Sequence, residues 1–285
     1  MTLARENGLL KQPLGASLIH DLGSGTIGCC NQNGGLMAAK SIDEIIVDLT
    51  EIVERAREDN SRIGYFAAMY RKVTLAIKEA IDAGEFEDAE RMSRLDVVFA
   101  RRYIDASAEF MAGKAPTDSW KVAFDGAGRW RPIIIQHLII GMNAHINLDL
   151  GIAAATVAPG AELAALEGDF KTINAVLSRL VDGFTADVAQ VSPWIGLLDR
   201  IGGRADDLVI NFSIGVARTE AWDLAGQLAP LSEPEWEQVV VARDQWTAGF
   251  GELLLHPGWL VSCGLLAIRI RESNNILRVI EVLSN

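Results

Sequence analysis

Three residues that could do chemistry, His137, His145 and Asp149, fall within one apolar segment of the chain. His145 and Asp149 are four residues apart, so on a helix they share a face and can bind a metal ion or exchange a proton. His137 precedes His145 by eight residues, or about 12 Å along a helix, too far for both histidines to bind one ion directly. The spacing predicts metal ligands or an acid–base pair at His145 and Asp149, with His137 as a nearby acid–base group.

A simpler interpretation of this segment is structural. His145 and Asp149 can hydrogen-bond across one turn while Asn143 and Asn147 tie neighbouring helices together, because a buried polar group without a partner costs about 1 to 3 kcal/mol. The metal interpretation implies a divalent ion, zinc or iron, whose remaining ligands must come from other helices. The available carboxylates there are Asp96, Asp105, Asp169 and Glu220.

Basic residues lie where the same helix should begin. Arg129, Trp130 and Arg131 precede Pro132, which suits the first position of a helix. Two guanidinium groups and the positive end of the helix dipole could converge there on a phosphate or carboxylate. Equally, both arginines could pair with surface acids.

Polar residues also interrupt two other apolar segments. In LDVVFARRYIDA (95–106), Arg102 and Asp105 are three residues apart and can pair. In NFSIGVARTEAW (211–222), the spacing of Asn211, Arg218 and Trp222 puts them near one side of a helix. We expect substrate contacts from the following residues: Arg102, Tyr103, Trp130, Arg131, Asn143, Asn211 and Arg218.

The elements that must position these residues are helices. Apolar residues recur at helical spacing from Ser41 onward, and the segment after Pro132 is apolar on nearly every side, which is typical of a buried helix. The pattern predicts an all-α fold, a single-domain bundle around a central helix at about 132–155, preceded by an N-terminal arm over residues 1–40. The predicted first helix begins at Ser41, and further helices cover roughly 61–84, 87–113, 118–124, 132–155, 161–190, 193–201, 204–228 and 232–254. The segment 259–271 is ambiguous between helix and strand, and Ser273 is predicted to cap a last helix.

The composition and charge of the chain exclude some classes of protein. The chain has 285 residues, a formal net charge of -12 and 49% hydrophobic residues, which suits one large domain and counts against a nucleic-acid partner. No uninterrupted apolar stretch reaches the roughly 20 residues of a membrane span. The N-terminus lacks a secretory pattern, and three cysteines make a poor disulfide framework, so we expect a cytoplasmic protein with reduced thiols.

Four segments resemble one known family of bacterial proteins, DUF5995, over about residues 41–284: FARRYIDA (99–106), RWRPIIIQHLIIGMNAHINLDLGIAAA (129–155), DFKTIN (169–174) and NFSIGVARTEAW (211–222). The resemblance implies no reaction. The residues that match family motif positions are Arg102, Tyr103, Asp105, Trp130, Arg131, His137, Asn143, His145, Asn147, Asp149, Asn174, Asn211 and Arg218. The H-x-x-x-D helix is also similar to half of the metal site in the zinc-dependent phospholipase C and P1 nuclease group.

These observations lead to one expected function and two alternatives. The leading hypothesis is a metal-dependent hydrolase acting on a small, partly apolar and anionic substrate, in which His137 shuttles a proton and Arg131 holds the anionic group. The second is a metal-free isomerase or cyclase that uses the His145–Asp149 pair. The third is a non-catalytic carrier of a lipid or metabolite.

Overall fold

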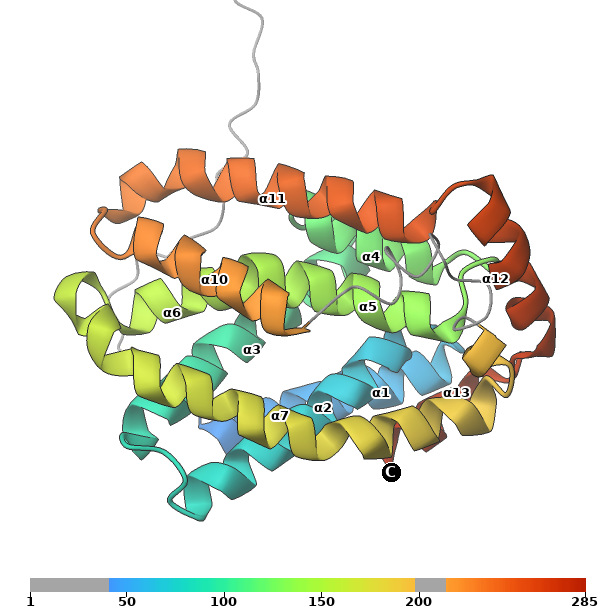
Figure 1. The fold of residues 1–285 in the computed structure, drawn as a ribbon, viewed down its shortest axis with the longest axis horizontal. Coiled ribbons are helices and arrows are strands. Elements are labelled where there is room, and N and C mark those ends of the chain that lie inside the picture. Colours follow the sequence, from blue (N-terminus) through green and yellow to red (C-terminus); the bar gives the residue numbers. More distant parts are fainter. Residues whose placement is uncertain (1–40, 198–213) are drawn as a thin grey trace, which may run out of the picture. The chain divides into compact units, whose positions relative to one another are not determined.

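The computed structural model describes residues 41–197 and 214–285, and throughout these residues the elements are helices, with no strand (Figure 1). The predicted all-α fold is confirmed. The predicted N-terminal arm and Asn211 lie outside the described residues. In chain order the α-helices are α1 (Ile42–Glu58), α2 (Ile63–Asp82), α3 (Ala89–Met111), α4 (Asp118–Ala127), α5 (Ile134–Ala144), α6 (Gly151–Val157), α7 (Leu163–Val191), α10 (Ile214–Leu228), α11 (Glu233–Leu255), α12 (Trp259–Arg271) and α13 (Ile276–Ser284).

Local capping signals set several helix ends. Ser41 and Glu44 form a reciprocal capping box at the start of α1, with hydrogen bonds of 3.2 and 2.9 Å. Ser232 and Glu235 form the same motif before α11. Past the end of α2, Gly84 takes a φ of +72°, a left-handed conformation that glycine adopts without steric cost.

Four points of the predicted helix assignment change in the structure. The ambiguous segment 259–271 is the helix α12, and the cap of α13 is Asn275, whose side chain accepts a hydrogen bond from Arg278 N–H, rather than Ser273. Within the described part of 193–201, only the 3₁₀ turn η3 (Ile195–Leu197) forms. Pro132 lies before the cap position, so α5 starts two residues later than the proline suggests.

The predicted central helix is confirmed, with one change in its winding. α5, the π-helix η1 (His145–Leu150) and α6 follow one another without a break over Ile134–Val157. This segment is long and apolar enough to cross a membrane by length and composition, and 89% of its 18-residue apolar window is buried inside the protein, as expected for a core helix. Helices α2, α3, α4, α10 and α11 pack around it (Figure 1).

Two glycines on the central helix let its neighbours approach closely. A Cβ atom on Gly141 would lie 2.5 Å from the Phe66 ring of α2. A Cβ atom on Gly151 would lie 2.7 Å from the Ala221 carbonyl oxygen of α10. Real Cβ atoms do not come so near, so only glycine permits these two packings on either side of η1. The close approach surrounds the π-helix with side chains from both neighbours.

Candidate functional site

The structure brings His145 and Asp149 together within η1. The Nδ1 atom of His145 lies 3.2 Å from Oδ2 of Asp149, as their spacing predicts. The six residues that contain both are wound as a π-helix, which the sequence did not predict. Short π-helical segments inside α-helices are frequent at functional sites.

Two further donors hold the Asp149 carboxylate. Arg102 donates from Nε to Oδ1 at 2.7 Å, and Trp120 donates from Nε1 to Oδ2 at 2.8 Å. Burial acts to raise the pKa of Asp149, but the Arg102 charge and the hydrogen bonds from His145 and Trp120 outweigh it, so the pKa is lowered. Asp149 is therefore an ionised, fully buried carboxylate at neutral pH.

His145 lies in a box of aromatic rings. Phe99 stacks flat on the imidazole, with ring centres 3.6 Å apart, and Tyr70 meets it edge-on at 4.4 Å. Burial lowers the pKa of His145 despite the hydrogen bond and charge of Asp149, so the ring is neutral at neutral pH. Its Nε2 atom is buried and has no hydrogen-bond partner in the described residues. With Nδ1 on the carboxylate, the neutral ring carries its proton there and leaves a lone pair on Nε2.

This pair does not fit the predicted metal ion. Both Asp149 oxygens already accept charged or neutral donors, and a cation there would lie beside the Arg102 guanidinium. Among the described residues, no group of three or more His, Cys, Asp or Glu side chains is placed to hold a metal. Of the other carboxylates proposed as ligands, Asp169 binds Arg91 and the backbone before α3, and Glu220 pairs with Arg243.

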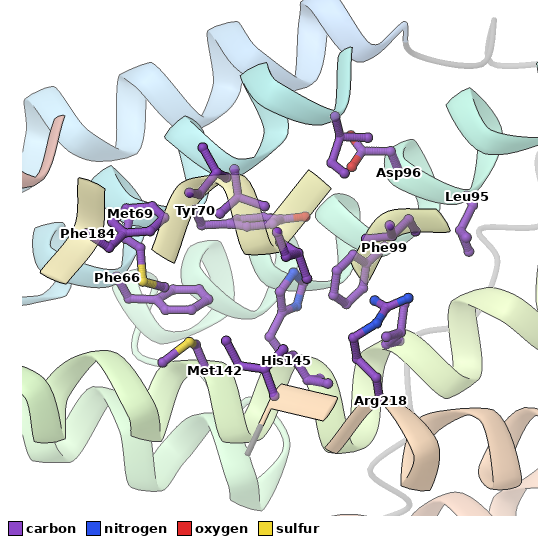
Figure 2. A pocket seen from close by; sticks show the side chains of 18 of the residues that line it. Phe66, Met69, Tyr70, Leu95, Asp96, Phe99, Met142, His145, Phe184 and Arg218 are labelled. Carbon is purple, nitrogen blue, oxygen red and sulfur yellow. The ribbon is translucent and has the colours of Figure 1, made fainter. Parts of the chain in front are cut away.

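A cavity of about 130 Å³ lies between α2, α3, η1, α7 and α10, and it is partly open to solvent (Figure 2). Of the predicted site residues, His145 and Arg218 line it. The remaining wall is almost entirely apolar, and its side chains include Phe66, Met69, Val73, Ile77, Met92, Leu95, Phe99, Met142, Ile146, Leu150, Ile173, Leu177, Leu180, Val181, Phe184 and Ile214.

Two more polar groups belong to the cavity wall. The Oδ2 atom of Asp96 and the hydroxyl of Tyr70 are buried and have no hydrogen-bond partner in the described residues. Burial raises the pKa of Asp96 to about 7, so this carboxyl group is about half protonated at neutral pH. Burial also raises the pKa of Tyr70, which keeps its hydroxyl protonated. Both side chains can thus donate a hydrogen bond into the apolar cavity.

Arg218 reaches the cavity from α10. It donates from Nε to Oδ1 of Asn174 at 2.7 Å, and its NH2 group donates to the Phe170 carbonyl. The guanidinium also lies over the Phe170 ring, 4.3 Å from its centre. The partner residues Phe170 and Asn174 belong to DFKTIN, so the structure joins two of the segments that carry the family resemblance.

His137 lies apart from this group. It packs edge-on against Tyr65 with ring centres 5.8 Å apart, and it does not line the cavity. Burial, followed by the charges of Arg62 and Arg269, lowers the pKa of His137 to about 3. His137 is therefore a neutral core histidine, and the structure does not bring it to His145 as a proton shuttle.

The predicted anion site at the start of the central helix is filled by the protein itself. Both oxygens of Glu272 accept a hydrogen bond from Ile134 N–H, at 3.0 and 3.1 Å. Arg269 lies 3.6 Å from Glu272 and stacks over Trp130. Arg131 is exposed at the surface. The carboxylate that complements this helix dipole is thus intramolecular, and neither Trp130 nor Arg131 lines the cavity.

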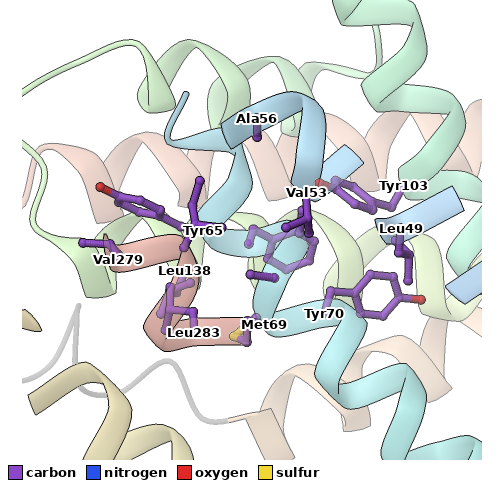
Figure 3. Packing of buried hydrophobic residues seen from close by; sticks show 14 of the residues in the cluster. Leu49, Val53, Ala56, Tyr65, Met69, Tyr70, Tyr103, Leu138, Val279 and Leu283 are labelled. Atoms are coloured by element: carbon purple, nitrogen blue, oxygen red, sulfur yellow. The ribbon is translucent and has the colours of Figure 1, made fainter. Parts of the chain in front are cut away.

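The remaining predicted contacts are structural. Asn143 donates to the Thr247 carbonyl of α11 at 2.9 Å, so it ties two helices together as the simpler interpretation held, whereas Asn147 donates to Asn143 at 2.9 Å within the central helix. Tyr103 is fully buried in the core formed by α1, α2, α3, α5 and α13 (Figure 3). The expected pair of Arg102 with Asp105 is wrong, because Asp105 lies 3.0 Å from Arg101 instead.

Sequence reasoning missed the side chains that surround His145. Trp120, Tyr70 and Phe99 come from three different helices, and no spacing within one helix could bring them together. One signal was available: a buried Trp needs a partner for its indole N–H, and Trp120 opens a short amphipathic helix. The identity of that partner depends on packing between helices.

Comparison with known proteins completes the description of the site. No curated protein and no solved structure matches the chain, and the similarity to the phospholipase C and P1 nuclease group is not supported by any match. Residues 42–257 match the model of one family, described as "Family of unknown function (DUF5995)". This match contains His145, Asp149, Arg102 and the described cavity wall, and the chain therefore belongs to the DUF5995 family.

Proposed function

We propose that this protein is a metal-free acid–base enzyme that isomerises a small, partly apolar substrate in the cavity lined by His145. The observation that carries the proposal is the state of His145, whose Nδ1 is held by Asp149 while its buried Nε2 has no partner in the described residues. A carboxylate that fixes the tautomer of a histidine in this way prepares the free ring nitrogen to act as a base.

The chemistry follows from the groups present. The Nε2 lone pair of His145 takes a proton from an activated C–H bond, and the ionised Asp149 stabilises the imidazolium that forms. The protonated ring then returns the proton to a different atom of the substrate, so the net reaction is an isomerisation. Hydroxyl and carboxyl donors from Tyr70 and Asp96 stabilise the negative charge that develops on the substrate.

Phe99 controls access to the base. Its ring covers the imidazole face at 3.6 Å, and Nε2 is buried among the surrounding side chains. Phe99 itself is partly exposed and lines the cavity, so it can turn aside without disturbing the central helix. A substrate that enters the cavity therefore meets Phe99 beside His145, and movement of this ring opens space next to the imidazole.

The test uses 5-nitrobenzisoxazole, a small neutral molecule whose ring a base opens by removing one C–H proton, breaking the N–O bond and releasing a coloured cyanophenolate. We expect wild type to exceed free imidazole at equal concentration by about 100-fold or more. His145→Gln should lose this excess, and Asp149→Asn should lose a factor on the order of ten or more. His137→Gln and the exposed His256→Gln serve as controls and should match wild type. Equal rates in wild type and folded His145→Gln would exclude His145 as the base.

A non-catalytic carrier is the second candidate, favoured by one observation. The cavity wall is almost entirely apolar, with Met69, Met92 and Met142 among its side chains, and flexible methionines suit ligands of varied shape. A carrier would bind the same probe without opening its ring. Calorimetry alongside the rate measurement separates the two functions.

A further inference from the structure

The two ends of the cavity differ in chemistry. Phe66, Met69, Met142 and Phe184 gather at one end, and these lining side chains are all uncharged (Figure 2). The opposite end carries Arg218 and Asp96, next to Leu95 and Phe99. The positions along the helices agree, since Phe66 and Phe184 lie near one end of α2 and α7, while Ile77 and Ile173 line the cavity further along. A ligand that fits this cavity has one apolar and one polar end.

The charge at the polar end is that of Arg218. Its side chain is buried, with 5% exposed, and its hydrogen-bond partners in the described residues are neutral oxygens of Asn174 and Phe170. No carboxylate in the described part of the chain forms an ion pair with it. A desolvated cation is costly unless an anion compensates it. Burial accordingly lowers the pKa of Arg218 to about 10.

The protonated form of Asp96 does not oppose an anion at this end. Its Oδ2 atom is buried without a partner in the described residues, and burial raises its pKa to about 7. In its protonated form the carboxyl group carries no charge and offers a hydrogen-bond donor. Both Arg218 and the protonated Asp96 thus present hydrogen-bond donors at the polar end of the cavity.

We infer that the cavity takes an amphiphilic monoanion, a short-chain carboxylic acid whose carboxylate binds Arg218 and whose apolar tail extends toward Phe66, Met69 and Phe184. The inference names the substrate class of the site assigned above and rests on that proposed function only for what happens to the ligand after it binds. A cavity near 130 Å³ resembles those that hold a benzene-sized molecule, so a tail of about six carbons fits. In this inference Arg218, and not Arg131 as the sequence suggested, binds the anionic group of the substrate.

Calorimetric titration with butanoate, hexanoate and octanoate tests how the affinity depends on the length of the apolar tail. Each added methylene should tighten binding about fourfold until the tail reaches the apolar end, near six carbons. Hexan-1-ol and hexylamine have the same tail with a neutral or cationic head. We expect hexanoate to bind at least about tenfold more tightly than either, since an ion pair with a desolvated guanidinium favours the anion. Equal affinity for hexanoate and hexan-1-ol would overturn the inference, as would an absence of hexanoate binding.

Two variants assign the preference to Arg218. Arg218→Met keeps a side chain of similar length without the charge, so it should lose the preference for hexanoate and still bind hexan-1-ol. Arg218→Lys keeps the charge and should retain a preference, which covers the case in which the methionine variant does not fold. Arg179→Met on the exposed face of α7 is the control, because Arg179 pairs with Glu85 outside the cavity. Wild-type hexanoate affinity in folded Arg218→Met would refute the role of Arg218.

Binding and turnover give separate answers here. Calorimetry needs no reaction, so hexanoate binding without ring opening of 5-nitrobenzisoxazole would support this inference and remove the proposed enzyme. Ring opening that depends on His145, with no preference for hexanoate, would leave the enzyme and remove the anionic substrate class.

Discussion

Arg102 donates its Nε–H to the Asp149 carboxylate at 2.7 Å, although 47 residues separate the two and the arginine remains partly exposed. The contact ties α3 to the π-helix at the centre of the fold. It also supplies the positive charge that keeps a carboxylate with 1% exposure ionised. The electrostatic state of the candidate site thus depends on a residue that does not line the cavity.

Removal of this charge should destabilise the protein. Arg102→Met leaves Asp149 as a buried carboxylate without its cation, which typically costs about 3 to 5 kcal/mol, and urea unfolding measures the loss. The neighbouring Arg101→Met removes exposed ion pairs with Asp48 and Asp105, so it should cost about 1 kcal/mol or less. Similar losses in both variants would show that the Arg102 contact has no special role.

Asp96 should make stability depend on pH. Burial raises its pKa from 3.8 to about 7, so the folded state favours the protonated form and its contribution is lost as pH rises through 7. Asp96→Asn mimics the protonated form. The variant should match wild type near pH 4 and exceed its free energy of unfolding by on the order of 4 kcal/mol at pH 9. Denaturant unfolding across this range, with the exposed Asp105→Asn as control, checks the effect; a difference independent of pH would contradict it.

Phe99 should limit the rate of the proposed reaction. Phe99→Ala uncovers the imidazole of His145, so ring opening of 5-nitrobenzisoxazole should become several-fold faster even though the protein loses up to about 3 kcal/mol of stability. Phe110→Ala is the matched variant on α3, because Phe110 packs on Phe124 away from the cavity. It should be destabilised without becoming faster, and a slower Phe99→Ala enzyme would argue against a covering role.

Gly141 should resist substitution because of its contact rather than its conformation. In Gly141→Ala the new Cβ atom would lie 2.5 Å from the Phe66 ring, and overpacking of this kind costs about 1 to 3 kcal/mol. Gly249 on α11 has nothing within 4 Å, so Gly249→Ala should gain up to about 1 kcal/mol from helix propensity. Thermal unfolding of the two variants should shift in opposite directions.

The sequence allowed prediction of features that depend on local spacing. The central helix was predictable because residues 133–155 are apolar on nearly every side, and the His145–Asp149 contact because four residues span about one turn. The π-helical winding of η1 was not predicted from the sequence.

The site contacts that could not be predicted from the sequence are contacts between different helices. Arg102 was predicted to pair with Asp105, three residues away, whereas its partner is Asp149 on another element. Trp120 and Glu272 are further examples, because each meets its partner from a distant segment. Periodicity identifies which face of a helix is buried, and the side chains that meet across that face follow only from the packed structure.

The capping of α5 by Glu272 has a consequence for synthesis. Ile134 and Glu272 are separated by 138 residues, so a ribosome makes the central helix long before its N-terminal cap exists. Until α12 has left the exit tunnel, the first amide groups of α5 cannot meet their carboxylate, and the helix must wait in an uncapped state. Completion of the contact that caps α5 therefore requires translation of the C-terminal region.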